Sequence, residues 1–515
     1  MKQLFRALSC TLLTLCLTAC GGSGKIVSFS WFVDEIPTNL DPLMAQTSAE
    51  VIACKHLYTG LYQLDEAGVP QPGCASGYEL SADGLTYTFT IRPDLYYRTA
   101  RGDTSSYAIT ADDFVFAFRR MFRPETNSPY ANIFSGIRNS TQVLEGQLPE
   151  TALGVSAKDD YTLVIQLTAP DKSFLEKLTL PGAMPCDEAY FESTDGTYGL
   201  SKKTSLSNGD FYLYNWTDGG LFLRRKAQGD LVNNLRLVTN TSPLGTPPTQ
   251  LVENGKSSAA LDAGTDPTSL QQQMYSNTTW CLRFSGNEVF ANDLLRQALT
   301  SAALEIPLPK DTTLYGPTEG IIPDGVRLDG MNYREQVGST IPHPGDGDAL
   351  WQQALTQLEA SQLKGLSLLV PEEADSRFVQ TLNGTWQQKY GIFFNVETVD
   401  AKTFARRLAA NDYAVALAPV QLTVSDPSLL LGSLRDTLPA AAQASSEILW
   451  DNAVQKIGSA RLNALGQLER FLADNAYVVP LYRQNARLLI DPHVSGLLFD
   501  PFGPALDVRF THYSE

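Results

Sequence analysis

The sequence predicts an α/β protein built from more than one domain, and three observations carry this prediction. The chain has 515 residues, which is too long for a single ordinary hydrophobic core and suggests about three or four domains or lobes. Apolar residues make up 43% and charged residues 18%, the balance of a soluble folded protein. In the second half, strand and helix patterns alternate, as in a lobe with a mostly parallel sheet.

The first half reads as strands with two helices between them. Thr110 is a suitable N-cap, Asp112 and Asp113 favour the positive end of a helix, and Phe114 and Phe118 follow at helical spacing. Apolar and polar residues alternate over 85–91, which predicts a strand with one wet face. We expect strands over 26–32, 85–91 and 161–167, a hairpin over 211–216 and 221–225, and helices over 48–61 and from 110 onward.

The second half supplies the alternating pattern. We expect helices over 349–360, 375–389 and 401–410, strands over 366–370, 392–399, 413–418 and 478–482, and one long helical stretch over 448–475. There is no internal repeat and no low-complexity tract, so the chain does not read as a repeat protein.

The N-terminus reads as an export signal. Lys2 and Arg6 precede a short apolar stretch over 8–17, and Leu17-Thr18-Ala19-Cys20 leads into a Gly/Ser segment. This order resembles the lipobox of bacterial lipoproteins, which implies a signal peptide over 1–19, diacylation of Cys20 and a tether over 20–25. The alternative is an ordinary secretory signal with an incidental cysteine.

Four cysteines remain after the signal and Cys20: Cys54, Cys74, Cys186 and Cys281. They allow three disulfide pairings in an oxidising compartment, and Cys54 with Cys74 closes the shortest loop. Four buried free thiols are the alternative. No CxxC is present, so zinc-ribbon or thioredoxin-like chemistry is unsupported.

The net charge and the absence of enzyme motifs exclude several classes of function. The net charge of −17 argues against nucleic acid as a partner. The sequence has no HExxH, GxSxG or GxGxxG motif, and its four histidines contain no i, i+4 pair. We therefore expect neither an enzyme nor a metal site, and no cofactor.

Several motifs, in order along the chain, resemble those of the substrate-binding lipoproteins of bacterial ABC importers, the solute-binding family 5 that includes oligopeptide- and dipeptide-binding proteins. The motifs are Leu40-Asp41-Pro42, LYTGL at 57–61, ADGLTYTFTIR at 82–92, TADDFV at 110–115, RPETNSPY at 123–130, DLLRQAL at 293–299 and VPLY at 479–482. Each motif is weak alone, but their shared order is specific.

The resemblance implies an α/β, two-lobed, periplasmic-binding-protein-like fold with a hinge and an extra subdomain in the first lobe. Lobe I would comprise 26–277 plus 480–515, with an inserted subdomain over 51–184, and lobe II would comprise 278–479. The implied function is to capture peptides between closing lobes, as a monomer on the outer face of the cytoplasmic membrane, and to deliver them to ABC permease subunits.

The sequence departs from the family at the ligand site. Oligopeptide binders have an Asp in a segment like GWxADYxxP that pairs with the peptide's ammonium group. Alignment on Asp426-Pro427 places Thr423 at that Asp, Val420 at the Trp and Pro419 at the Gly. A buried ammonium needs a charge partner, so recognition of a free N-terminus is in question unless Asp426 swings into the role.

Family positions carried over to this chain give the predicted ligand-binding residues. They are Gln46, Ser48, Tyr130, Val420, Gln421, Leu422, Thr423, Asp426 and Tyr482. The weakly polar run over 420–423 indicates a neutral, blocked or hydrophobic ligand. Two alternatives therefore stay open: the same fold with a non-peptide solute, and a surface receptor for peptide signals without import.

Overall fold

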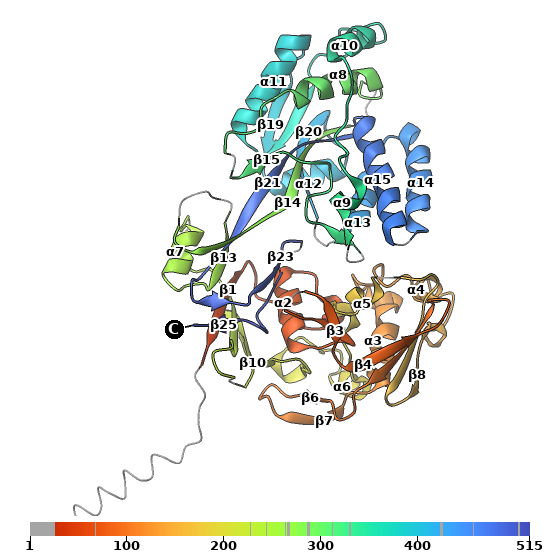
Figure 1. Cartoon of the computed structure of the whole chain (residues 1–515), viewed down its shortest axis with the longest axis vertical. Helices are drawn as coiled ribbons and strands as arrows, with labels where there is room; N and C mark the ends of the chain where they lie inside the picture. The colour runs from red at the N-terminus through yellow and green to blue at the C-terminus, as the bar shows by residue number, and fades with distance from the viewer. Residues whose placement is uncertain are drawn as a thin grey trace, which may run out of the picture.

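The computed structural model describes residues 26–515, apart from 67, 172, 227, 244, 263, 265–267, 286–288, 312, 329–330, 423–425, 457, 503–504 and 515. The predicted signal peptide, Cys20 and the tether lie outside the described residues. The chain forms two lobes joined by long strands, the α/β architecture that the motifs implied (Figure 1). Among the described helices, none combines the length and the apolar character that a membrane span requires.

Lobe I is built on a four-stranded sheet. Its order is β1 (Ser28–Val33), β12 (Asn234–Thr239), β11 (Gly220–Arg224) and β10 (Tyr212–Thr217). Helix α2 (Ser48–Leu57) packs on this sheet through Ile52 and Leu57, which belong to the same buried cluster as Phe29. The helix begins there because the Thr47 and Glu50 side chains form a capping box.

The enlarged part of lobe I has its own sheet and its own core. The sheet order is β4 (Ala75–Leu80), β5 (Thr86–Ile91), β9 (Thr162–Gln166) and β8 (Val155–Asp159), and α3 (Ala111–Met121) covers it. Phe89, Phe114 and Phe118 are fully buried between them. The predicted helix start is found, because Thr110 and Asp113 form a capping box.

Smaller elements complete this lobe. They are the hairpins β2 (Tyr62–Leu64) with β3 (Pro70–Pro72) and β6 (Tyr96–Arg98) with β7 (Thr104–Ala108), the helices α4 (Ser140–Leu144), α5 (Phe174–Lys177), α6 (Glu188–Ser193) and α7 (Pro248–Glu253), and the 3-10 helices η1 (Pro42–Met44), η2 (Pro124–Thr126), η3 (Glu150–Ala152), η4 (Pro181–Ala183) and η5 (Lys202–Thr204).

One sheet runs through both lobes. Its order is β13 (Ala259–Asp262), β21 (Val478–Ile490), β14 (Gln271–Phe284), β20 (Val415–Gln421), β18 (Ser367–Pro371) and β19 (Asn395–Val399), with β15 (Tyr315–Gly316) on the free side of β21. Only β19, β18 and β20 are parallel. The expectation of a mostly parallel sheet was wrong because the long strands β14 and β21 join it antiparallel to their neighbours.

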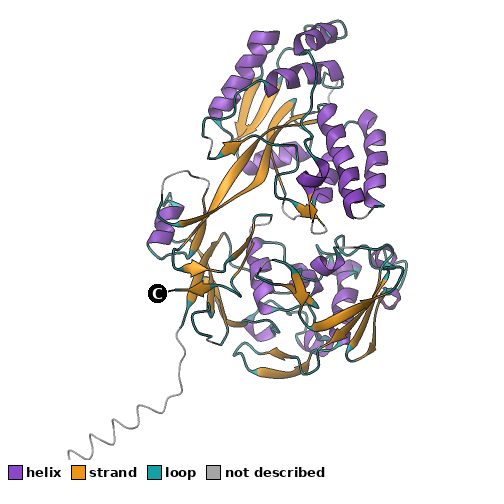
Figure 2. Ribbon diagram, viewed as in Figure 1, coloured by secondary structure: helices purple, strands orange, loops and turns teal. Residues whose placement is uncertain are grey.

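Helices cover lobe II on several sides (Figure 2). They are α8 (Asp293–Leu304), α9 (Tyr333–Val337), α10 (Gly347–Leu355), α11 (Ser376–Tyr390), α12 (Ala401–Ala409), α13 (Pro427–Arg435), α14 (Ala440–Val454) and α15 (Gly458–Asp474), with the short hairpin β16 (Arg327–Leu328) and β17 (Met331–Asn332). The single long helix expected over 448–475 is two helices, because Gly458 takes a left-handed φ of 57° and the chain turns back.

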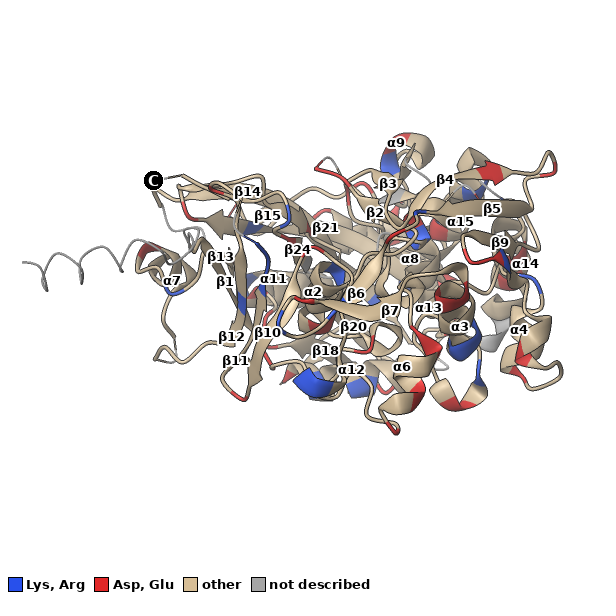
Figure 3. Ribbon diagram, turned by 90° about the horizontal axis from the view of Figure 1, so that it is seen from below, with Lys and Arg blue, Asp and Glu red and all other residues tan. Residues whose placement is uncertain are grey.

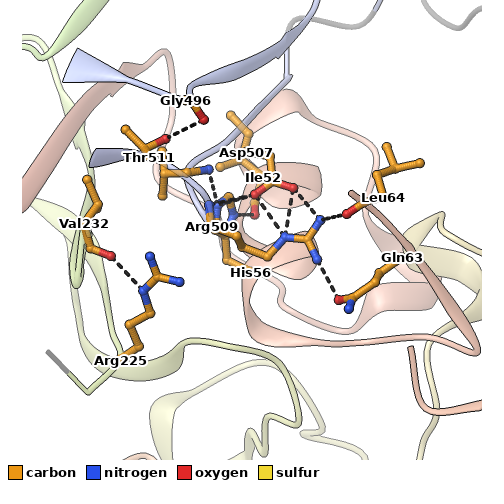
Figure 4. Close-up of polar contacts among 11 residues, drawn as sticks. Ile52, His56, Gln63, Leu64, Arg225, Val232, Gly496, Asp507, Arg509 and Thr511 are labelled. Atoms are coloured by element: carbon orange, nitrogen blue, oxygen red, sulfur yellow. Dashed lines mark hydrogen bonds and ion pairs between the residues drawn. The ribbon is translucent and has the colours of Figure 1, made fainter. Parts of the chain in front are cut away.

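The C-terminal segment returns to lobe I. It forms β22 (Val494–Ser495), β23 (Leu498–Asp500), β24 (Ala505–Asp507) and β25 (His512–Tyr513). Its anchor is a buried polar cluster around His56 of α2 (Figure 4). His56 Nδ1–H donates to the carbonyl of Ile52 at 2.7 Å, and Nε2 accepts the N–H of Val508 at 3.0 Å. Beside it, Arg509 donates to the Asp507 carboxylate at 2.6 Å.

We expect this cluster to make lobe I sensitive to acid. Burial lowers the pKa of His56, although the nearby Asp507 opposes the shift. A histidine with a lowered folded-state pKa contributes stability above its unfolded value of about 6.5, and this contribution is lost as pH falls below it. Chemical denaturation from pH 7.5 to 4.5 should show the loss. It should shrink in His56→Gln, whose amide does not titrate; an unchanged slope in that variant would contradict the assignment.

Charged residues are distributed over both lobes. In the view of Figure 3, basic and acidic segments alternate, and no continuous basic face is visible. The distribution agrees with the net charge of −17 and offers no surface suited to a polyanion in that view.

Candidate functional site

The candidate site lies where the two lobes meet. Strands β14 and β21, of 14 and 13 residues, run from one lobe to the other as paired antiparallel neighbours. In Figure 1, α2, β3 and α5 of lobe I face α9 and α13 of lobe II. A solute held here would touch elements from both halves of the chain.

On lobe I, the structure brings the predicted residues Gln46, Ser48 and Tyr130 together. Tyr130 is buried, and its hydroxyl donates to the carbonyl of Ala45 at 2.8 Å. Gln46 is exposed, and Ser48 is half-buried as the first residue of α2. Tyr130 therefore holds the backbone of the segment that presents Gln46 and Ser48.

On lobe II, the predicted residues Val420, Gln421 and Leu422 end strand β20. Val420 and Leu422 are 4% and 3% exposed and pack into the cluster around α13, α14 and α15. Gln421 is exposed, and its amide donates to Thr278 Oγ1 of β14 at 3.1 Å. The apolar side chains of Val420 and Leu422 thus face the core of lobe II. The sequence alone could not show whether they line this core or the ligand site.

Strand β20 has a free edge next to these residues. Residues 415–421 pair with β14 along their whole length, but β18 pairs with β20 only at Val415 and Ala416. No other described strand covers the opposite edge of β20 beyond Ala416. Free backbone donors and acceptors therefore remain beside the junction of the lobes.

Asp426 is occupied as a structural group. Its Oδ1 accepts the backbone N–H and the hydroxyl of Ser428 at 2.8 and 2.6 Å, which caps α13. Its Oδ2 lies 3.4 Å from a guanidinium nitrogen of Arg461. Recruitment of Asp426 to a ligand would break the cap or the ion pair. Thr423, the residue aligned with the family's Asp, lies outside the described residues.

Tyr482 is fully buried in an aromatic cluster of lobe II. Its ring centroid lies 4.7 Å from that of Phe378, 5.5 Å from Tyr315 and 6.1 Å from Trp280. Its hydroxyl has no hydrogen-bond partner among the described residues, and burial raises its pKa. The cluster supports β21 at the point where that strand leaves lobe II.

The structure distinguishes between the two alternatives for the cysteines, disulfide bonds and free thiols. Cys54, Cys74, Cys186 and Cys281 are all free and buried. Burial raises the pKa of both the Cys74 and Cys186 thiols to about 12, so these groups stay protonated and unreactive at neutral pH. The described residues contain no group of three or more His, Cys, Asp or Glu side chains that would hold a metal ion.

A two-lobed fold with strands crossing between the lobes can hold a solute where the lobes meet. Residues 69–440 match the bacterial extracellular solute-binding proteins, family 5 middle region, and the chain belongs to this family. Members bind solutes and are not enzymes, in agreement with the lack of a catalytic motif. The chain is 22% identical to the Dipeptide-binding protein DppE of Bacillus subtilis, over 91% of this chain and 88% of that protein.

Two other relatives extend this comparison. The Periplasmic oligopeptide-binding protein OppA of Salmonella typhimurium is 23% identical over 89% of this chain and 87% of its own length. The Probable deoxycholate-binding periplasmic protein YgiS of Escherichia coli is 24% identical over 89% and 88%. The family relationship thus spans nearly the whole chain, while the solutes named for its members differ.

Solved structures agree with the fold. The pheromone receptor PrgZ superposes with a TM-score of 0.70 at 22% identity, covering 95% of this chain and 100% of that one. Listeria monocytogenes OppA bound to peptide superposes with a TM-score of 0.68 at 20% identity, covering 95% and 99%. At these identities the likeness establishes the two-lobed fold, and the solute has to be argued from this chain's own residues.

The sequence analysis predicted no ligand-binding residue after Tyr482, yet the structure brings one more segment between the lobes. The hairpin of β23 and β24 carries Asp500 and Phe502 at its turn. Asp500-Pro501 followed by Gly503-Pro504 is a turn signature that could have indicated the hairpin. Nothing in the sequence indicated that its tip reaches the other lobe.

Proposed function

We propose that the protein is the substrate-binding subunit of an ABC importer, which captures peptides between its two lobes and delivers them to membrane permease subunits. The peptide-binding names of DppE and OppA support this proposal, as does the likeness to peptide-bound OppA. It acts as a monomer, because one chain supplies both lobes of the site.

The observation that carries the peptide assignment is the free edge of β20 beyond Ala416. An extended peptide can add to such an edge as a further strand, with backbone hydrogen bonds supplying affinity whatever the side chains are. The free edge is the one opposite β14, and Gln421 at the end of β20 contacts Thr278 of β14, so a ligand on this edge is linked to the crossing strands through β20. Such a ligand is placed to influence how the lobes close.

The proposed site combines both lobes. Lobe I (26–277 plus 480–515, including the subdomain over 51–184) contributes Gln46, Ser48 and the supporting Tyr130. Lobe II (278–479) contributes Val420, Gln421 and Leu422, mainly through backbone groups, while Asp426 and Tyr482 support the site. A ligand drives closure only if it binds the closed form more tightly than the open form, so contacts to both lobes are required.

Native mass spectrometry tests the peptide assignment. The protein without residues 1–22 is produced in the bacterium that encodes it, and the mass of the intact protein is measured under native conditions. It is then denatured, and the masses of any released ligands are measured. A series of short peptides is the expected result. An empty protein, or a single non-peptide mass, would mean that the altered segment over 419–423 binds another solute. The peptide assignment would then be wrong.

Cys20 is proposed as the lipid anchor, which places the protein on the outer face of the bacterial cytoplasmic membrane. We expect Cys20→Ala to release most of the protein from membranes in fractionated cells, because a soluble body without acyl chains has no apolar anchor. Peptide binding by the released protein should be unchanged. Full retention of the variant on membranes would refute the anchor.

Two alternatives have specific support. The name of YgiS includes deoxycholate, a non-peptide solute, and its identity to this chain is similar to that of DppE and OppA. The likeness to PrgZ supports a surface receptor for peptide signals. Uptake of labelled peptide by cells with and without the gene separates import from signalling, and the released masses separate peptide from other solutes.

A further inference from the structure

We propose that Asp500, at the tip of the C-terminal hairpin, is the carboxylate that receives the ammonium group of a bound peptide. It would replace the family's Asp, whose aligned position here is Thr423. The inference rests on the proposed peptide-binding function and names the group that would recognise the ligand's free N-terminus.

The hairpin of β23 and β24 connects the two lobes. Its base belongs to lobe I, where Asp507 is buried beside His56 and Arg509. Its tip packs against lobe II, where Phe502 is 8% exposed within the cluster around α13, α14 and α15. In Figure 1, β23 stands between the lobes.

The hairpin is also fixed to a crossing strand. The side-chain amide of Asn277 on β14 donates to the carbonyl of Pro501 at 3.0 Å, and the rings of Tyr275 and Phe499 lie 5.2 Å apart. Asp500 is therefore held on three sides, by the base of the hairpin, by β14 and by the docked Phe502. Because the Asp500 backbone is already fixed, little conformational entropy of the hairpin is lost when a ligand binds.

The Asp500 side chain is exposed, yet the surrounding protein raises its pKa, and only Lys55 opposes the shift noticeably by attraction. Part of the side chain is therefore open to solvent, while the surrounding protein excludes water from the rest of it. One oxygen accepts the backbone N–H of Phe502 at 2.9 Å. No Lys, Arg or His nitrogen among the described residues lies within 4.0 Å of the carboxylate, so it can accept hydrogen bonds from an incoming cation.

Other acidic side chains of the crossing region already hold cations. Asp426 pairs with Arg461, Asp324 with Arg483, Asp262 with Arg487, and Asp507 with Arg509. Removing any of these carboxylates from its partner would leave a guanidinium without its counter-charge, at a cost of several kcal/mol where the pair is buried. Asp500 can bind an ammonium group without that cost. This favours Asp500 over a reorientation of Asp426 towards the ligand.

The test compares binding of two peptide libraries to the full-length protein in detergent. One library consists of tetrapeptides with free N-termini, and the other contains the same peptides acetylated on the α-nitrogen. We expect the wild type to prefer the free peptides. Asp500→Asn keeps the acceptor for Phe502 N–H and should lose about tenfold or more of the affinity for free peptides, while its affinity for acetylated peptides changes little.

Two further variants make the result specific. Asp500→Glu keeps the charge and should retain part of the preference. Asp218→Asn removes an exposed carboxylate in the β10–β11 turn, changes the net charge equally and should leave the preference intact.

Three outcomes overturn the inference in distinguishable ways. If the wild type binds both libraries equally, the ammonium is not recognised, although the peptide proposal survives. If Asp500→Asn keeps the full preference, another group receives the ammonium. If the wild type binds neither library, the proposed function itself fails and the inference fails with it.

Discussion

Replacement of Glu469 by Ala is expected to lower the free energy of unfolding of lobe II by about 3–5 kcal/mol. The Glu469 side chain, on α15, is fully buried. Its two oxygens accept the N–H of Ile322 at 2.9 Å, the hydroxyl of Tyr333 at 2.9 Å and a guanidinium nitrogen of Arg334 at 2.8 Å. Truncation leaves these three donors without their acceptor, one of them a nearly buried cation.

Chemical denaturation of Glu469→Ala and of a matched control measures this effect. Glu335→Ala removes an exposed carboxylate from α9, one residue beyond Arg334, and should change the free energy of unfolding by no more than about 0.5 kcal/mol. Because the segment over 319–341 contributes both Tyr333 and Arg334, its amide protons should also exchange faster in Glu469→Ala. Equal stability of the two variants would mean that water replaces the lost acceptor.

Much of the architecture could be predicted because its signals are local. The helix at Thr110 follows from a capping box, and the strand over 85–91 follows from strict alternation. Local signals failed where the outcome depends on distant partners. The composition of β14 does not reveal that its neighbours are antiparallel, and the period of the residues over 448–475 does not reveal the turn between α14 and α15.

The site was less predictable than the fold, for a physical reason. Family motifs indicate which backbone positions lie near the junction of the lobes, but the direction of each side chain depends on packing. Val420 and Leu422 occupy a predicted segment and yet point into the core, whereas Gln421 between them is exposed. Asp500 is separated from β20 by almost 80 residues of chain, and only the hairpin's packing against β14 brings it between the lobes.

Replacement of Arg120 by Met is the second change for which we expect a large effect, a loss of about 3–5 kcal/mol in the stability of lobe I. Arg120 and Asp41 form an ion pair in which the side chains are 5% and 8% exposed. The guanidinium also lies 4.1 Å from the ring centroid of Phe191. Met fills much of the same volume, so the loss reports mainly the uncompensated charge of Asp41.

The variant Arg119→Met offers a matched comparison on the same helix. Arg119 is half-buried and has no ion pair among the described residues, so its replacement should cost no more than about 1 kcal/mol. In the double variant Asp41→Asn with Arg120→Met, part of the loss should return, because no unpaired charge remains buried. A double variant as unstable as the sum of the single ones would show that the two residues act independently.

The Arg120 change also separates stability from binding. Asp41 caps the N-terminus of η1, and the chain then passes through Ala45 to Gln46 and Ser48, the residues of lobe I proposed to meet the ligand. If the ion pair positions that segment, Arg120→Met should weaken peptide binding at temperatures where the variant is still folded, whereas Arg119→Met should not. Unchanged affinity in folded Arg120→Met protein would assign the pair to stability alone and leave Tyr130 as the group that holds the segment.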